Sequence, residues 1–253
     1  MTVSDDRIFT AALIVIGDEI LSGRTQDANL AYLAKWLNVQ GIRLREVRVV
    51  ADDMDAIAGA VNALSPPHHD YLFTTGGIGP THDDITVDAI SQALGLPVVM
   101  HPKAEATLRG YYGDRITDAR LRMARVPQGA DLLPNPVSGA PGIRVGDIFI
   151  MAGVPQITQG MLTGLDGQLR GGRPVLTRSV GAWIGESAVA DLLAATERAH
   201  DGAQIGSYPF WRDGKVGANF VVRSPDPAIL AATADALLTG LRAAGVDPID
   251  GEI

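Results

Sequence analysis

The sequence predicts an α/β fold, in which a mostly parallel sheet carries helices on both faces and a small two-layer α+β domain follows. Three observations carry this prediction. Strand-like apolar runs alternate with segments of helical periodicity through the first two thirds of the chain. A glycine-rich turn joins one of these runs to the next helix. The pattern then changes after Gly171-Gly172-Arg173-Pro174, where glycine and proline indicate a linker.

The first four elements follow one another without a long break. Ala11 to Ile16 is apolar throughout, as expected for a strand buried on both faces of a parallel sheet. Leucine and alanine then recur at helical spacing and stop before Gly41, which suits a helix C-cap. Arg43 to Val50 predicts the second strand. Met54 to Leu64 predicts the next helix, with an aspartate as its N-cap.

The third strand ends in an unusual turn. Asp70 to Thr74 is apolar and aromatic enough for a buried strand. The turn Thr74-Thr75-Gly76-Gly77-Ile78-Gly79-Pro80 follows, and its glycines allow a tight bend and close approach to a ligand. A helix is predicted from near Thr81 to Leu94, closed by Gly95. The free N–H groups and positive dipole end of that helix would then face the turn.

The rest of the first domain is less regular. The next strand falls near Val99, and residues 101–123 are helical with interruptions. Gly146-Asp147 separates two short apolar runs, which is the signal of a two-residue hairpin. The second run, Ile148 to Met151, leads into Gly153-Val154-Pro155 and another amphipathic helix.

The linker divides the chain into a first domain, residues 1–172, and a small domain, residues 173–253. The small domain shows the order β-α-β-β-α, which is typical of a two-layer α+β arrangement. Its elements are expected at Val175 to Val180, Glu186 to Arg198, Ile205 to Phe210, Val216 to Arg223 and Ala228 to Ala244.

Composition narrows the functional classes. The 253 residues are 46% hydrophobic and 20% charged, with a formal net charge of −8, which argues against a nucleic-acid or membrane-surface binder. The absence of cysteine excludes disulfides, thiol nucleophiles and cysteine-type zinc sites. The apolar run from Ala11 to Ile16 is too short to span a membrane. We expect a cytoplasmic protein without nucleic-acid or membrane partners, which holds any anionic ligand by local features.

The turn Gly76-Gly77-Ile78-Gly79 is the first candidate site. It lacks the Gly-Lys-Ser/Thr of a P-loop, and His82 stands where a dinucleotide-binding fingerprint needs its third glycine. Helix N-termini bind anions readily, so a phosphate site is one interpretation. A tight strand-to-helix turn that needs glycine only for its geometry is the other. The residues alone favour neither.

Carboxylates next to this turn form the second candidate. Asp83 and Asp84 would lie beside a bound phosphate, where they could hold a divalent cation such as Mg, Mn or Co. Glu19, with Asp18, follows the first strand and should reach the same edge of a parallel sheet. The competing interpretation is helix capping, because Thr81-x-x-Asp84 is close to a capping box and acids favour the first turn of a helix.

Several segments together resemble the molybdopterin-binding family that includes MoaB and MogA, and most closely the N-terminal domain of CinA proteins. The resemblance covers about residues 7–171, and the segments after the linker resemble the small domain that follows in that group. The segments that carry it are Ile16-Gly17-Asp18-Glu19-Ile20-Leu21-Ser22-Gly23, Thr25-Gln26-Asp27-Ala28-Asn29, Thr75-Gly76-Gly77-Ile78-Gly79-Pro80-Thr81-His82-Asp83-Asp84-Ile85-Thr86, Asn135-Pro136, Ala140-Pro141-Gly142 and Gly153-Val154-Pro155.

The resemblance implies a three-layer α/β domain that binds the phosphate end of a pterin or nucleotide. It matches the family's acidic residue to Asp84, with Asp83 beside it, as the catalytic candidates, and the metal candidates are Asp84, Asp83 and Glu19. The ligand-binding residues that it implies are Thr75, Gly76, Gly77, Ile78, Gly79, Thr81, Gly153, Pro155 and Asn29.

Two functions follow from this resemblance. The first is divalent-metal-dependent hydrolysis of a nucleotide pyrophosphate of the ADP-ribose or FAD type. The second is binding of a phosphorylated pterin such as molybdopterin, in molybdenum cofactor biosynthesis, without hydrolysis. Whether the chain is an enzyme is therefore open at this point. Relatives assemble, so a homo-oligomer is expected.

Overall fold

The computed structural model describes residues 7–253, so the first six residues of the first predicted domain lie outside the described part. The chain divides into two compact units, with the boundary between Gly172 and Arg173. Each unit has its own sheet and its own hydrophobic core. No helix within residues 7–253 has the length and apolar character that crossing a lipid bilayer requires.

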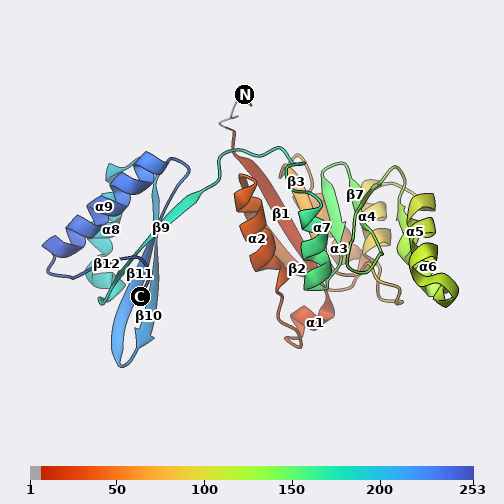
Figure 1. Ribbon diagram of the computed structural model, residues 1–253, viewed down its shortest axis with the longest axis horizontal. Coiled ribbons are helices and arrows are strands. Elements are labelled where there is room, and N and C mark those ends of the chain that lie inside the picture. Colours follow the sequence, from red (N-terminus) through yellow and green to blue (C-terminus); the bar gives the residue numbers. More distant parts are fainter. Residues whose placement is uncertain (1–6) are drawn as a thin grey trace. The chain divides into compact units, whose positions relative to one another are not determined.

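The first unit is an α/β sandwich around one six-stranded sheet, with strand order β2-β1-β3-β8-β7-β6 (Figure 1). The first four strands in that order run parallel, and β7 and β6 are antiparallel additions at one edge. The mostly parallel sheet predicted from the sequence is therefore present. The strands are β1 (Phe9–Ile16), β2 (Ile42–Val50), β3 (Tyr71–Thr75), β6 (Asp131–Leu133), β7 (Gly142–Val145) and β8 (Ile148–Met151).

Two helical layers cover the sheet because successive strand side chains point to opposite faces. On one face Leu13, Phe73 and Phe149 pack under two helices, and the two phenylalanine rings stack with centroids 4.8 Å apart. On the other face Ile14 and Leu72 pack under two more helices. The first pair is α2 (Asn29–Val39) and α7 (Pro155–Thr163), and the second is α3 (Met54–Leu64) and α4 (Thr86–Leu94).

A short helical segment with a small core of its own completes the first unit. Leu108 and Ala124 are fully buried in this core. The flanking strands β4 and β5 pair with each other and not with the main sheet. The elements are α1 (Asp18–Leu21), β4 (Val98–Met100), α5 (Pro102–Tyr112), η1 (Gly113–Arg115), α6 (Asp118–Leu121), η2 (Arg122–Ala124) and β5 (Arg125–Pro127).

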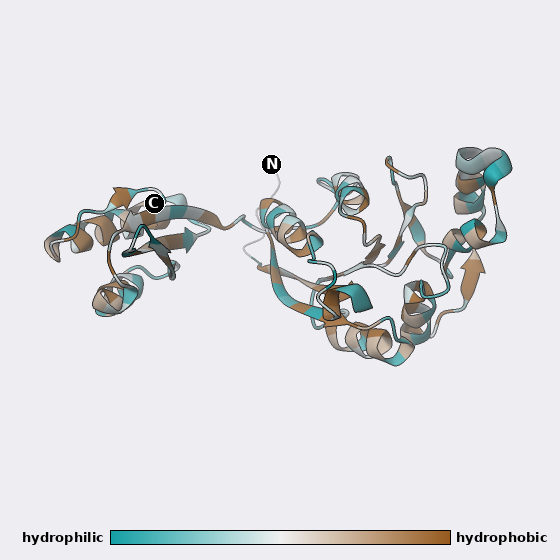
Figure 2. Cartoon of the chain, turned by 90° about the horizontal axis from the view of Figure 1, so that it is seen from below, coloured by the Kyte–Doolittle hydropathy of each residue, from teal (hydrophilic) through white to brown (hydrophobic). Residues whose placement is uncertain are grey.

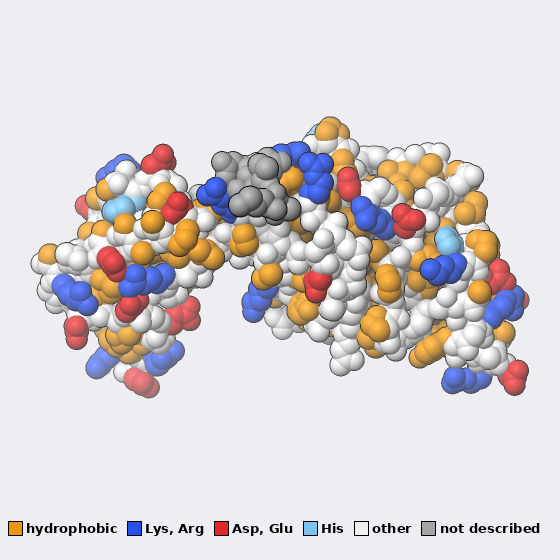
Figure 3. Space-filling model, turned by 45° about the horizontal axis from the view of Figure 1, so that its top comes forward, with side chains coloured by type: hydrophobic (Ala, Val, Ile, Leu, Met, Phe, Trp, Pro, Cys, Tyr) orange, Lys and Arg blue, Asp and Glu red, His pale blue; other side chains and the backbone are white. Residues whose placement is uncertain are grey.

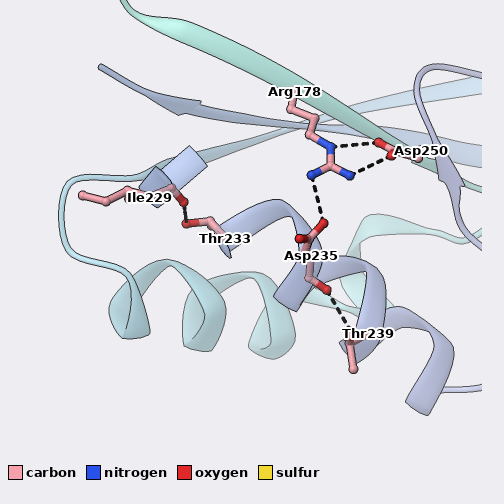
Figure 4. A network of polar contacts seen from close by, with 6 residues as sticks. All are labelled: Arg178, Ile229, Thr233, Asp235, Thr239 and Asp250. Atoms are coloured by element: carbon pink, nitrogen blue, oxygen red, sulfur yellow. Dashed lines mark hydrogen bonds and ion pairs between the residues drawn. The ribbon is translucent and has the colours of Figure 1, made fainter. Parts of the chain in front are cut away.

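The second unit is a four-stranded antiparallel sheet with order β10-β11-β9-β12, packed against two helices. It contains one strand more than the predicted β-α-β-β-α order, because residues 249–250 pair with β9. An arginine network ties this sheet to a helix: Arg178 bonds both Asp235 and Asp250 (Figure 4). The elements are β9 (Leu176–Ala182), η3 (Glu186–Ala188), α8 (Ala190–Ala199), β10 (Gln204–Arg212), β11 (Lys215–Ser224), α9 (Pro227–Ala243) and β12 (Ile249–Asp250).

The surface shows no region of a single charge sign on the face drawn in Figure 3, where acidic and basic side chains alternate on both units. Figure 2 shows hydrophobic and hydrophilic segments alternating along the helices, as expected for helices with one buried face.

One predicted boundary is wrong. The helix expected to begin near Thr81 begins at Thr86, five residues later. The Asp84 carboxylate accepts the Thr81 backbone N–H at 2.7 Å, and this local bond competes with helix formation. Residues 81–85 therefore extend the loop after β3, and the chain turns into α4 only where Thr86 N donates to the Gly77 carbonyl at 3.1 Å.

Candidate functional site

A cleft of about 560 Å³ lies at the carboxyl ends of the parallel strands. Loops after four strands contribute to its wall: Gly17 and Glu19 after β1, Asp52 after β2, residues 76–80 with Asp83 and Asp84 after β3, and residues 152–155 after β8. This is the edge where ligands bind in open parallel sheets. Strand order alone brings together segments that are more than 100 residues apart in the sequence.

The glycines of the turn after β3 are needed for close packing. A Cβ at Gly76, whose φ is +107°, would lie 2.1 Å from the Ile16 carbonyl oxygen. A Cβ at Gly77, with φ of +64°, would lie 2.2 Å from Thr86 Oγ1. Both positions combine a left-handed backbone with no space for a side chain. The interpretation that these glycines serve geometry therefore has direct support, whatever binds above them.

The backbone N–H groups of the turn are the donors that are available to bind an anion. The first N–H of α4, on Thr86, is already bonded to Gly77, and its hydroxyl donates to the Gly76 carbonyl at 2.9 Å. Within residues 7–253, we find no acceptor for the N–H groups of Gly77, Ile78 and Gly79. An anion bound here would therefore accept hydrogen bonds mainly from the loop amides. The N-terminus of α4, which the sequence predicts to face the turn, would contribute less to anion binding than expected.

One carboxylate oxygen of Asp84 is hydrogen-bonded within the loop. Its Oδ2 accepts both the backbone N–H and the hydroxyl of Thr81. A Cβ on residue 79 would lie 2.6 Å from the same oxygen, so the carboxylate can occupy this position only because residue 79 is glycine. Oδ1 is not bonded to another described residue. Asp84 lines the cleft and stabilises the loop that forms it.

Asp83 faces the solvent side of the cleft, with 64% of its side chain exposed. The nearby Thr81 hydroxyl and the backbone N–H of Asp83 itself hold the pKa of this carboxyl below its ordinary value. It therefore remains charged at neutral pH. His82, next to it, is 96% exposed and lies outside the larger cleft.

Asp52 also lines the cleft, although no sequence motif marks it as a site residue. Its Oδ2 accepts the Asp18 backbone N–H at 3.0 Å, which ties the loops after β1 and β2 together. Burial raises the pKa of the Asp52 carboxyl, and the like charges of Asp18, Glu19 and Asp83 raise it further. Glu19, Asp52 and Asp83 line the cleft, and no basic side chain is among its described lining residues.

The remaining predicted residues divide between the wall of the cleft and the layer beneath it. Ile78, Gly153 and Pro155 line the cleft, whereas Thr81 lines a smaller adjoining cavity. Asn29 is buried and donates from Nδ2 to the Gly153 carbonyl at 2.8 Å, so it positions the loop after β8.

Thr75 is also buried, directly before the turn. Two buried side-chain oxygens of this layer, Asn29 Oδ1 and Thr75 Oγ1, have no hydrogen-bond partner among the described residues.

The cleft has carboxylates that could bind a cation, but the described residues do not form a complete coordination site. No three acidic or histidine side chains converge as a cation cage within residues 7–253. Glu19, Asp52, Asp83 and Asp84 nevertheless line one cleft with oxygen donors only. This donor set fits Mg²⁺ or Mn²⁺, because such ions commonly use one or two protein carboxylates and complete their shell with water and ligand phosphates.

These features define an α/β protein with an acidic cleft at the carboxyl ends of its parallel strands. Residues 12–170 match the family described as a probable molybdopterin binding domain, and the chain belongs to this family. Residues 174–250 match the middle domain of FAD synthase. The resemblance seen in the sequence motifs is thus confirmed.

Individual relatives support the assignment. A CinA-like protein from Frankia casuarinae is 36% identical over 204 residues, which is 73% of this chain and 46% of that protein. Protein TK1472 from Thermococcus kodakarensis is 33% identical over 166 residues, 60% of this chain and 66% of that protein. The chain thus spans about half to two thirds of these relatives.

A solved structure gives the same answer for the first unit. The crystal structure of the protein CinA of unknown function from Thermoplasma acidophilum superposes with a TM-score of 0.60 at 33% identity. The superposed region covers 64% of this chain and 98% of the CinA chain. The fold of the first unit is therefore shared with a CinA protein.

Proposed function

We propose that the cleft binds a nucleotide pyrophosphate of the ADP-ribose or FAD type as its divalent-cation complex and hydrolyses it. The observation that carries the proposal is the charge of the cleft wall: four carboxylates, from Glu19, Asp52, Asp83 and Asp84, and no lysine, arginine or histidine. Such a wall repels a bare phosphate and attracts a phosphate that arrives with Mg²⁺ or Mn²⁺.

Different groups of the cleft would bind the phosphate and the cation. The free N–H groups of Gly77, Ile78 and Gly79 would bind non-bridging oxygens of one phosphate. Asp83, which stays ionised, and Glu19 would hold the cation, with Oδ1 of Asp84 available to it. A cation held there supplies Lewis-acid polarisation of the phosphoryl oxygen and a bound water of lowered pKa.

The apolar part of the wall suits a flat ring. Ile16, Ile78, Val154 and Ile157 line the cleft together with Met161. A flavin, an adenine or a pterin would each bury apolar surface here. The second candidate, a phosphorylated pterin bound without hydrolysis, is favoured by the family to which residues 12–170 belong and is kept for that reason.

The test is direct. Purified protein is incubated with ADP-ribose or FAD and with Mg²⁺, Mn²⁺ or Co²⁺, and the release of AMP is followed by chromatography. We expect AMP to form with a metal and to disappear when a chelator is added. If both substrates remain intact with all three metals, and molybdopterin binds equally well with and without chelator, the pterin-binding function replaces the hydrolase.

A further inference from the structure

Arg122 lies at the border of the acidic cleft. The cleft shares Ile78, Gly79, Asp84 and Met123 with an adjoining cavity of about 100 Å³. Arg122 lines that smaller cavity, and the next residue, Met123, lines both. A guanidinium group is thus present one residue from the wall of a cleft that has no basic side chain of its own.

The bonding of Arg122 differs from that of its neighbours. Arg125 pairs with Asp88 through two nitrogens, at 2.5 and 3.2 Å, and Arg109 pairs with Glu105 at 2.7 Å. Arg120 donates to the Arg115 carbonyl and lies over the Tyr112 ring. Arg122 donates Nη2 to the Pro80 carbonyl of the turn after β3, and no carboxylate within residues 7–253 pairs with it.

The backbone of Arg122 is well supported. It belongs to η2, whose last residue, Ala124, is fully buried in the small core formed with Leu108. The Ala124 carbonyl also accepts the His101 backbone N–H at 2.8 Å. The backbone that carries the guanidinium is therefore held by packed structure, and the exposed guanidinium reaches the turn through its bond to Pro80. It presents five N–H donors, of which one is used on Pro80.

We infer that Arg122 binds the second phosphate of a two-phosphate ligand whose first phosphate lies on the amides of Gly77, Ile78 and Gly79. This inference rests on the proposed function and names its ligand class: diphosphate esters, in preference to monophosphates. The guanidinium is a planar fork that matches phosphate oxygens, and a charged hydrogen bond of this kind is stronger than the neutral one to Pro80. A ligand with one phosphate fills the amide site and leaves Arg122 on the turn.

The experiment compares α,β-methylene-ADP, which resists hydrolysis, with AMP. Both are titrated calorimetrically in the presence of Mn²⁺ into the wild type, Arg122→Ala and Arg122→Lys. We expect Arg122→Ala to weaken binding of the diphosphate by about tenfold to a hundredfold and that of AMP by less than about twofold. Arg122→Lys should restore part of the loss. Arg120→Ala, an arginine that donates to a backbone carbonyl away from the cleft, is the control and should bind both ligands as the wild type does.

The outcomes separate the two proposals. If Arg122→Ala loses affinity for both ligands equally, Arg122 only holds the turn in place and the inference is wrong; it is equally wrong if neither affinity changes, or if the wild type does not prefer the diphosphate. If the wild type shows the expected preference but does not hydrolyse ADP-ribose, the inference stands and the hydrolase proposal fails. If the wild type binds neither ligand, both fail.

Discussion

Carboxylates in the two units of this protein have different electrostatic environments. In the small unit, Asp235 and Asp250 converge on Arg178, whose nitrogens lie 2.7 to 2.9 Å from their oxygens (Figure 4). The Arg178 hydrogen bonds lower the pKa of Asp250, and the pKa of Arg178 is raised in turn. In the cleft, burial raises the pKa of Asp52, and the like charges of Asp18, Glu19 and Asp83 raise it further.

The difference shows which acids stabilise the fold and which are free to recruit a ligand. A paired carboxylate is satisfied by the chain itself and contributes to stability when it is ionised. A carboxylate among like charges opposes folding when it is ionised, and a bound cation relieves that repulsion. The two groups use the same residue type, so substitutions to the neutral amides test the contrast with little change in shape.

The largest expected effect is on cation binding. Replacing two cleft carboxylates, in the double variant Glu19→Gln with Asp83→Asn, should lower Mn²⁺ affinity by about a hundredfold or more, because each charged contact is worth about 1.5–3 kcal/mol. Isothermal titration calorimetry measures this affinity. The matched double variant in the small unit, Asp235→Asn with Asp250→Asn, should leave it unchanged. Equal affinity in all three proteins would show that the cleft does not hold the ion.

The second effect is on pH dependence. The pKa of Asp52 lies above its ordinary value of 3.8, so Asp52 takes up its proton at a higher pH than a free aspartate does. The cleft that holds the ion then loses a negative charge, so Mn²⁺ affinity begins to fall at that pH. The pKa of Asp250 lies below 3.8, so its stabilising contribution is complete above pH 3.8 and is lost as pH falls through the lowered value. Acid should therefore release Mn²⁺ before it loosens the small unit.

Calorimetry at a series of pH values follows the ion, and the fluorescence of Trp183 and Trp211, both in residues 173–253, follows the small unit. A variant with Trp36→Phe removes the signal of the first unit. Loss of Mn²⁺ and unfolding of the small unit at the same pH would contradict the assignment of opposite pKa shifts.

The sequence predicted the fold well because hydrophobic periodicity records which faces are buried. The alternation of β1, α2, β2, α3 and β3 follows from runs such as Ala11 to Ile16, which are apolar on both sides. The start of α4 was predicted wrongly because Asp84 bonds back to Thr81, and a side chain that competes with the helix looks the same in the sequence as one that caps it.

The cleft was harder to predict than the fold. Asp52 and Asp53 are adjacent, and either suits the N-cap of α3. In the structure Asp53 takes this role, accepting the Asp55 and Ala56 N–H groups at 3.1 and 2.9 Å, which leaves Asp52 free to join the cleft. Arg122 is one of several arginines between Arg109 and Arg125, and which of them has no carboxylate partner depends on tertiary contacts that spacing does not reveal.

A smaller effect is expected when the paired network is broken. Arg178→Ala leaves Asp235 and Asp250 facing each other without a cation, and both are largely exposed, so solvent screens most of the change. We expect the Tm of the small unit to fall by about 2–5 °C. Arg198→Ala, on the exposed side of α8, should change it by about 1 °C or less. Differential scanning calorimetry reports both, and a Tm for Arg178→Ala equal to that of Arg198→Ala would show that the network contributes no stability.

The smallest effect, and the one with the opposite sign, is expected at Asp52. Asp52→Asn removes a charge that burial and its neighbours disfavour but keeps an acceptor for the Asp18 N–H, so the metal-free protein should gain about 1–2 °C in Tm at pH 7. Because the folded pKa exceeds 3.8, the gain should vanish below pH 3.8, where both states of the wild type are protonated.

Asp53→Asn is the adjacent control, since asparagine also caps helices, and its Tm should stay near that of the wild type. Saturating Mn²⁺ should reverse the order of Asp52→Asn and wild type, because the ion stabilises whichever protein binds it more tightly. A variant that is less stable than the wild type without metal would mean that the repulsion around Asp52 is already compensated within the chain, and the contrast between the two groups of carboxylates would then fail at its most sensitive point.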